Sequence, residues 1–186
     1  MSQATALAHP GPWSIDDLDG LPDGGQRYEI IDGSLLMSPP PSARHQGIAA
    51  RVSALLREAA SPGLEVVEAT GLKIGPGLLV PDVLVATSDA IWKGQPTLAP
   101  ADVVLVVEIV SPSSETMDRV TKPSLYRDVG IPNFWRIEID SASRPFVVVH
   151  RLSGGAYVEQ LTVAVGERVQ LDQPFPLVLV PATLAQ

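Results

Sequence analysis

The feature that most constrains this sequence is the run DVVLVVEIV at residues 102–110. It is the most strongly apolar stretch of the chain, and valine and isoleucine dominate it. β-Branched residues in a run of this length favour a central strand that is covered on both faces. The chain is therefore expected to build layers of structure on either side of this strand.

The remaining patterns predict those layers. A helix is expected from Ala43 to about Ala60, after the cap residue Ser42, and a second helix is expected from the SPSSET segment to about Val129. An Asp-Gly pair at residues 32–33 predicts a tight hairpin. Further strands are expected at residues 64–74, at 78–86 with an interruption at Pro81, and at 133–139, 146–152 and 156–163. This order predicts an α/β (α+β) sandwich with a mixed β-sheet flanked by helices and an additional C-terminal β-rich segment.

Length and composition predict one domain. The chain has 186 residues with 45% hydrophobic content, which favours a single domain over residues 13–186 after a flexible N-terminal arm, residues 1–12. No apolar stretch approaches the ~18 residues of a membrane span, so no membrane partner is expected. The first dozen residues have neither a basic start nor a long apolar run, so they do not resemble a signal peptide, and a cytoplasmic location is expected.

Charge and cysteine content limit the chemistry. The chain has no cysteine, so any metal has to bind oxygen or imidazole ligands. The net charge of −8 argues against strong, non-specific binding to nucleic acid. The charge is still compatible with an enzyme that acts on nucleic acid, because a local arginine cluster can act within an acidic protein.

Two carboxylates stand where apolar residues are expected. Glu108 interrupts the central run, so its buried charge has to be neutralised, paired or bound to a metal. The alternative is a glutamate at the strand end that reaches solvent or pairs with an arginine. Asp82 follows Pro81, which cannot donate to a sheet and so marks a bulge or an edge that aims the next side chain into a site. The alternative for Asp82 is an ordinary turn residue.

Together the two carboxylates predict a site for a hard divalent cation. Oxygen ligands from neighbouring strands suit Mg²⁺, which takes one or two carboxylates and keeps several waters. The carbonyl oxygen of Ile109 is expected to complete the protein's share of the ligands.

Lys122 is the third element of the predicted site. It lies four residues from both Asp118 and Tyr126, so the three share one face of a continuous helix. An amine beside two carboxylates and a metal orients an attacking water or offsets charge that develops on a phosphate. The alternative is a solvated helix with an Asp118–Lys122 pair. Pro123 would kink the helix unless a helix begins near Lys122.

With these residues in place, the chain resembles the Uma family of restriction endonucleases, within the PD-(D/E)XK nuclease superfamily. The resemblance extends from about residue 13 to residue 152, in the ordered stretches YEIIDGSLLMSPPPSARHQ, VPDVLV, VVEIVSPSSETMDRVTKPSLY and GIPNFWRIE. It implies a restriction-endonuclease-like fold and phosphodiester hydrolysis with Mg²⁺, for which Mn²⁺ can substitute.

The resemblance also assigns residues. Asp82 matches the aspartate of the PD element, and Glu108 matches the acidic residue of the (D/E)XK element. Val110 occupies the lysine position of that element, and in the Uma-like pattern the lysine is shifted to the following helix, as Lys122. This departure makes the role of Lys122 depend on how its helix packs.

Further site residues are expected around this set. Glu29 falls at an acidic position typical of the first hairpin, where it would hold a metal-bound water or a second ion; the alternative is a polar residue on a half-exposed strand. Substrate contacts are expected from Arg44, His45, Arg51 and Tyr126. The alternatives are a capping or surface role for His45 and a packing role for Tyr126.

The sequence thus predicts a metal-dependent endonuclease that acts on nucleic acid, with DNA as the expected substrate and a homodimer as a way to make two cuts. One alternative is a catalytically inactive nuclease-fold protein that serves as a binding module, which the acidic charge and the displaced lysine favour. Another is a hydrolase of smaller phosphoesters.

Overall fold

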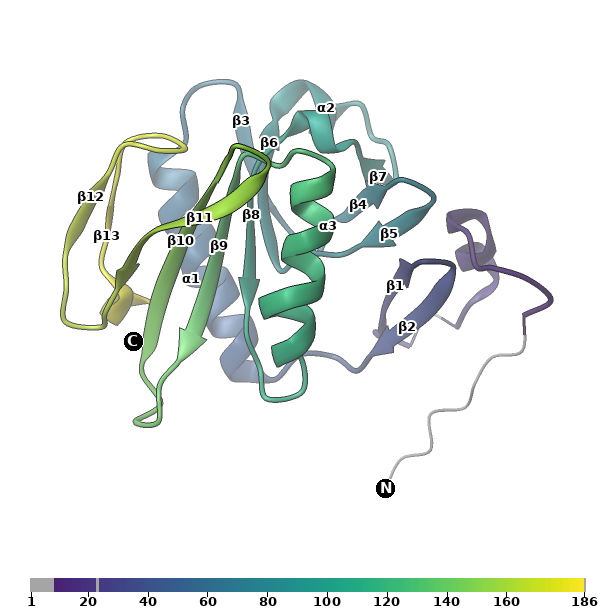
Figure 1. The fold of residues 1–186 in the computed structure, drawn as a ribbon, viewed down its shortest axis with the longest axis horizontal. Coiled ribbons are helices and arrows are strands. Elements are labelled where there is room, and N and C mark those ends of the chain that lie inside the picture. The colour runs from purple at the N-terminus through teal and green to yellow at the C-terminus, as the bar shows by residue number, and fades with distance from the viewer. Residues whose placement is uncertain (1–8, 23, 186) are drawn as a thin grey trace.

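The main sheet of the protein has six strands, in the order β11-β10-β9-β8-β6-β3, in a computed structural model that describes residues 9–22 and 24–185 (Figure 1). Its strands are β3 (Leu64–Glu68), β6 (Val83–Thr87), β8 (Val103–Ile109), β9 (Asn133–Ile139), β10 (Pro145–Ser153) and β11 (Ala156–Val163). β8 and β9 run parallel, and the other neighbours are antiparallel. The apolar run therefore forms one of the two central strands, as predicted.

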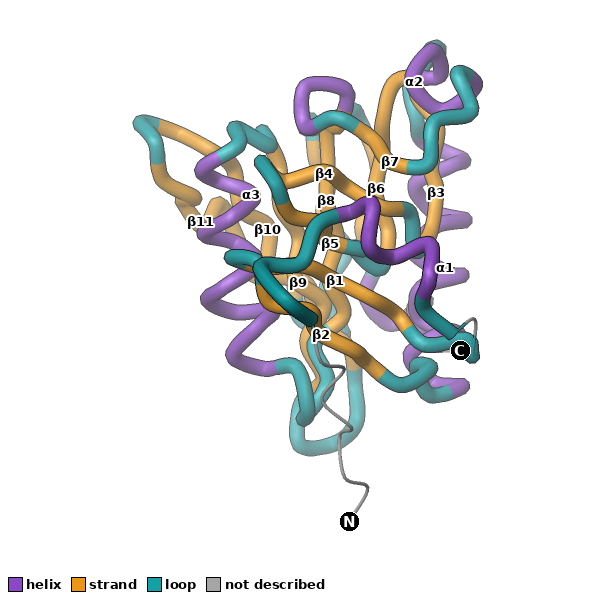
Figure 2. The backbone as a smooth tube through the Cα atoms, turned by 90° about the vertical axis from the view of Figure 1, so that its right-hand side faces the viewer, coloured by secondary structure: helices purple, strands orange, loops and turns teal. Residues whose placement is uncertain are grey.

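A second, smaller sheet lies beside the first, in the order β2-β1-β5-β4-β7 (Figure 2). Its strands are β1 (Arg27–Ile31), β2 (Ser34–Ser38), β4 (Gly71–Ile74), β5 (Gly77–Leu79) and β7 (Thr97–Leu98). The β1–β2 hairpin turns at Asp32 and Gly33, whose φ angles of 49° and 73° are those that an Asp-Gly turn tolerates. The predicted hairpin is confirmed.

Two of the predicted strands were wrong in the same way. Residues 64–74 were expected to form one strand, and residues 78–86 one strand interrupted at Pro81, but each segment forms two strands that belong to different sheets. Ala69, at a φ of 47°, lies between β3 and β4, where the first segment is interrupted. Pro81 and Asp82 separate β5 from β6 in the second segment. The chain therefore leaves the main sheet after β3 and returns to it at β6. The expected polar connection over residues 88–100 also holds a short helix, α2 (Ser88–Trp92), and strand β7.

Two helices cover opposite faces of the main sheet (Figure 1). α1 (Ala43–Ala59) begins where the Ser42 hydroxyl accepts a hydrogen bond from the His45 amide, and it packs on the face that carries Val83, Val85 and Val107. α3 (Lys122–Asp128) packs with the second sheet on the other face, which carries Leu84 and Val106. The period-two alternation of β6 and β8 thus places one set of side chains in each core.

The remaining segments are short. The C-terminal region forms a separate two-stranded sheet, β12 (Val169–Leu171) and β13 (Leu177–Leu179), on the α1 side of the main sheet. Helical turns of 3₁₀ type occur at Ile15–Gly20, Pro100–Asp102 and Pro181–Ala185, and a π-helical turn, Met117–Thr121, precedes α3. No helix in residues 9–22 and 24–185 has the length and apolar character needed to cross a membrane.

The predicted N-terminal arm, residues 1–12, falls largely outside the described residues. Its last four residues are described, and they make contacts. The His9 ring stacks on Trp13 with 4.2 Å between the ring centroids, and the Trp13 amide donates to the carbonyl of Gly33 in the first hairpin.

Candidate active site

The main sheet brings Asp82 and Glu108 side by side. Val83 of β6 lies opposite Val107 of β8, so the preceding residue of one strand and the following residue of the other are neighbours on the same face. Both side chains are almost fully buried, with exposed fractions of 4% and 1%. The amide of Ile109 donates to Asp82 Oδ2 at 2.8 Å and ties the two strands together at this point. Both carboxylates face the layer that α3 and the second sheet form.

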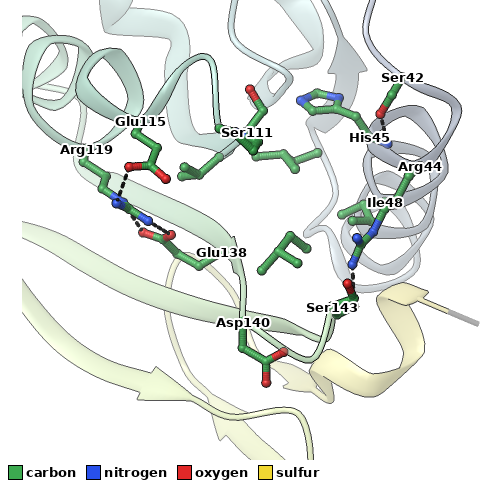
Figure 3. Close-up of a pocket in the computed structure, with 14 residues that line it drawn as sticks. Ser42, Arg44, His45, Ile48, Ser111, Glu115, Arg119, Glu138, Asp140 and Ser143 are labelled. Carbon is green, nitrogen blue, oxygen red and sulfur yellow. Dashed lines mark hydrogen bonds and ion pairs between the residues drawn. The ribbon is translucent and has the colours of Figure 1, made fainter.

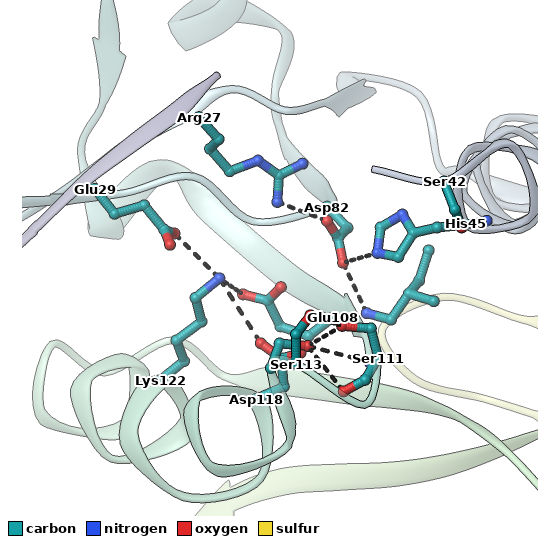
Figure 4. A network of polar contacts seen from close by, with 12 residues as sticks. Arg27, Glu29, Ser42, His45, Asp82, Glu108, Ser111, Ser113, Asp118 and Lys122 are labelled. Atoms are coloured by element: carbon teal, nitrogen blue, oxygen red, sulfur yellow. Dashed lines mark hydrogen bonds and ion pairs between the residues drawn. The ribbon is translucent and has the colours of Figure 1, made fainter. Parts of the chain in front are cut away.

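The amine of Lys122 reaches Glu108, and it also contacts Glu29 and Asp118 (Figure 4). Its Nζ atom lies 3.1 Å from Glu108 Oε1, 3.1 Å from Glu29 Oε1 and 3.9 Å from Asp118 Oδ1. The side chain is 5% exposed, so the amine is directed into the protein and not into solvent. The structure therefore brings Lys122 together with Glu108 and Glu29, and their catalytic roles stay predictions.

The backbone of the helix explains how Lys122 is aimed. The Lys122 amide donates to the carbonyl of Met117, a π-helical bond, and Pro123 occupies the first turn of α3, where its missing N–H is tolerated. The helix therefore begins at Lys122, which is the condition under which Pro123 does not disrupt it. Single π-helical turns are frequent at functional sites, because they rotate the following side chains relative to the preceding turn.

Glu29 comes from the second sheet. It lies in β1, is 5% exposed, and its Oε1 atom accepts a hydrogen bond from the Val80 amide at 2.8 Å in addition to the Lys122 amine. Of the two interpretations of Glu29, the structure excludes a half-exposed surface residue. The candidate site is thus shared between the two sheets.

Asp82 has two further partners, Arg27 and His45. Arg27 Nη1 lies 2.7 Å from Asp82 Oδ1, and His45 Nε2 lies 3.2 Å from Asp82 Oδ2. Burial alone would raise the pKa of Asp82, but the hydrogen bonds and charges of His45 and Arg27 lower it to about 2. Sequence reasoning missed Arg27. Its position two residues before Glu29 was the available signal, because residues i and i+2 of a strand share a face.

The electrostatics of Glu108 differ from those of Asp82. Burial raises the pKa of Glu108, the neighbouring carboxylates add to this rise, and Lys122 opposes it. Burial lowers the pKa of Lys122, but Glu108, Glu29 and Asp118 outweigh burial and raise it, so the amine stays protonated at neutral pH. An additional positive charge beside Glu108 would therefore favour the ionised form of its carboxyl group.

Of the four residues predicted to contact substrate, one lines the carboxylate cavity. His45 lines the cavity beside Asp82. Tyr126 is wholly buried and donates its hydroxyl hydrogen bond to Glu108, so the predicted contact with substrate is wrong. Arg44 and Arg51 do not line this cavity either. They are seven residues apart and share a face of α1, whereas His45 is turned by about 100° from Arg44, toward Asp82.

The carboxylates open into a cavity of about 500 Å³ that Arg27, Glu29, Asp82, Glu108, Asp118 and Lys122 line. A neighbouring cavity of about 430 Å³ shares His45, Ile109 and Ser111 with it (Figure 3). Arg44 lies in this second cavity, where it donates to the carbonyl of Ser143. Arg51 bonds the Gly47 carbonyl at 2.8 Å and lines a further hollow near the C-terminal turn.

The chemistry of the donors fits a divalent cation. Four carboxyl groups and two permanent cations, Arg27 and Lys122, line the cavity, which gives a formal charge of −2 apart from His45 when all four are ionised. Within the part of the chain that the structure describes, no three His, Asp or Glu side chains are grouped to hold a metal. Asp82 and Glu108 nevertheless supply the one or two carboxylates that Mg²⁺ takes when it keeps its waters. In an extended strand the N–H and C=O of one residue face the same edge, so the Ile109 carbonyl also faces Asp82.

This fold and site define a protein of the restriction-endonuclease-like class. The family model Uma2, described as "putative restriction endonuclease", matches residues 15–185. The chain therefore belongs to the Uma2 family. A crystal structure described as a "putative nuclease belonging to DUF820" from Anabaena variabilis ATCC 29413 shares the fold, with a TM-score of 0.71 and 20% identity over 93% of this chain and 97% of that one. No curated protein matches the chain.

Proposed function

We propose that this protein is a metal-dependent endonuclease that hydrolyses phosphodiester bonds, with DNA as its substrate. The description of the Uma2 family and that of the Anabaena protein support nuclease function in general. The observation that carries the finer proposal is that Asp82, directly before β6, lies beside Glu108 of β8, and that the buried amine of Lys122 contacts Glu108.

Asp82 and Glu108 are the residues that would hold Mg²⁺, or Mn²⁺ in its place, together with the Ile109 carbonyl. When bound, such an ion supplies Lewis acidity to the scissile phosphate and lowers the pKa of a bound water. Arg27 and the Ile109 amide keep Asp82 in place through contacts of 2.7 and 2.8 Å. The protein's own contribution is therefore a rigid, buried pair of oxygen donors.

Lys122 acts on the substrate in this proposal. An ammonium group has three donors, and Glu108 and Glu29 accept from two of them at 3.1 Å. The third donor is left for a phosphate oxygen or the attacking water. Glu29 orients the amine, because its own position is fixed by the Val80 amide. Cleavage of both DNA strands needs two such sites, which a homodimer would supply.

The test is cleavage by Asp82→Asn, a change that removes the charge and keeps the shape of the side chain. Plasmid DNA, single-stranded DNA, RNA and a small phosphodiester are incubated with protein and Mg²⁺. We expect the wild type to cleave DNA, and Asp82→Asn to lose at least about 100-fold in rate, because it removes the negative charge of a proposed cation ligand. The matched control is Asp89→Asn, which alters an exposed aspartate in the first turn of α2.

Other outcomes of the cleavage experiment would contradict or change the proposed function. Full activity of Asp82→Asn would refute the proposed site. Cleavage of only the small phosphodiester would redefine the substrate class. A wild-type protein that neither cleaves any of these substrates nor binds Mn²⁺ in calorimetry would instead support a nuclease-fold binding module.

A further inference from the structure

The hydroxyl of Tyr126 contacts the carboxylate of Glu108 from inside the core. Tyr126 is fully buried one turn after Lys122 in α3, and its hydroxyl donates to Glu108 Oε1. A phenol that is closed off from solvent in this way cannot touch a substrate. Within residues 9–22 and 24–185, its hydroxyl forms a hydrogen bond to Glu108 alone.

Lys122 uses the same oxygen atom. Its Nζ lies 3.1 Å from Glu108 Oε1, so this oxygen receives two donors, one from the phenol and one from the amine. A carboxylate oxygen has two acceptor positions, and both positions of Oε1 are therefore taken. Among the described residues, every hydrogen bond and ion pair of the Glu108 side chain goes to Oε1. The second oxygen, Oε2, is left for another ligand.

We propose that Tyr126 is a positioning residue that, with Lys122, saturates Glu108 Oε1 and so reserves Oε2 for the divalent cation. The inference rests on the proposed function, because it assumes that a cation binds beside Asp82. Without the phenol, the carboxylate gains freedom to turn about its last bond and to offer either oxygen to Lys122. The cation would then compete with the amine for both oxygens.

A structural role for Tyr126 makes a different prediction, and the chain offers a matched control. Tyr126 and Tyr157 both pack on Phe134, with ring centroids 6.0 and 5.6 Å from it. Each hydroxyl makes one hydrogen bond to a protein acceptor, since Tyr157 donates to the carbonyl of Ile131 at 2.8 Å. Neither tyrosine lines the carboxylate cavity, but the Tyr126 hydroxyl bonds a carboxylate of the site, whereas the Tyr157 hydroxyl bonds a backbone carbonyl.

The experiment compares Tyr126→Phe and Tyr157→Phe by calorimetry with Mn²⁺ and by thermal unfolding without metal. Both changes keep the ring, so the core volume is preserved. We expect Tyr126→Phe to weaken Mn²⁺ binding about 10-fold, as the loss of a partner behind a metal ligand does, and Tyr157→Phe to leave it unchanged. In DNA cleavage, Tyr126→Phe should lower kcat at low Mn²⁺ but not at saturating Mn²⁺, with KM for DNA unchanged.

The outcomes separate this inference from the function on which it rests. If the wild type binds Mn²⁺ and Tyr126→Phe binds it equally well, the inference is overturned and the proposed function stands. An equal loss of affinity in both variants would reduce Tyr126 to a packing role and also overturn it. If the wild type binds no Mn²⁺, the metal-dependent function fails, and this inference fails with it.

Discussion

At the scale of single residues, Asp82 is the most tightly held group of the site. Arg27, His45 and the Ile109 amide all contact its carboxylate, and only 4% of the residue is exposed. Pairing of this kind makes the charge of a buried group part of the stability of the fold. It also explains how a carboxylate can stay ionised in the interior before any cation is bound.

The lowered pKa of Asp82 predicts a pH-dependent contribution to stability. The pKa is about 2 in the folded protein and 3.8 ordinarily, so the ionised form favours the folded state. The contribution, about 2 kcal/mol, is complete above about pH 4 and is lost as the pH falls through 2. Urea unfolding of the wild type and of Asp82→Asn from pH 7 to pH 2 should show a difference in unfolding free energy that shrinks toward acid. A difference that is constant over this range would contradict the assignment.

At the scale of elements, the site depends on how β1 pairs with β5. β1 carries both Arg27 and Glu29, and it meets β5 where Ile30 lies opposite Leu78. Gly77 allows this approach, because a Cβ atom placed on it would lie 2.3 Å from the Ile30 carbonyl oxygen. That atom belongs to the backbone, so it cannot rotate away.

Gly77→Ala should therefore push β1 away from β5. We expect a loss of about 1–3 kcal/mol of unfolding free energy, as overpacking against backbone produces, and a loss of Mn²⁺ affinity as Glu29 and Arg27 move with β1. Denaturant unfolding measures the first effect and calorimetry the second. Gly166→Ala is the control, since a Cβ there has no atom within 4 Å. Equal stability of the two variants would show that β1 adapts without cost.

At the scale of the whole molecule, the protein is acidic and keeps part of its excess charge inside. The net charge is −8, and the site cavity contributes four carboxylates against two permanent cations. Folding brings these carboxyl groups together, and burial and the neighbouring carboxylates raise the pKa of Glu108. A divalent cation that binds only the folded protein would relieve this repulsion and stabilise the fold.

Divalent cations should therefore raise the melting temperature. At a Mg²⁺ or Mn²⁺ concentration of about 100 times Kd, the stabilisation is about 2.7 kcal/mol, or roughly 5–10 °C for a chain of this size. Differential scanning calorimetry with Mn²⁺ and then with excess EDTA should show the rise and its reversal, and Asp82→Asn should show neither. An equal rise in both proteins would indicate binding elsewhere on the acidic surface.

The sequence by itself determined the elements with strong local periodicity. The bounds of β9 and β11 agree with the prediction, and α1 and β8 agree to within one residue at each end. The positions of Asp82, Glu108 and Lys122 were also readable, because the two carboxylates break a local pattern of apolar residues and Lys122 follows helix spacing. Periodicity is a property of neighbouring residues, so one stretch of chain is enough to show it.

Only the tertiary structure decided which segments meet. It divided residues 64–74 between two sheets, placed Arg27 on Asp82 and turned Tyr126 toward Glu108 and away from solvent. It also directed Arg51 away from the carboxylates. Partners such as Arg27 and Asp82 are 55 residues apart, and their contact depends on the register and packing of several elements at once. No local sequence pattern shows a contact between residues so far apart in the chain. The partners of the site residues were therefore known only from the fold.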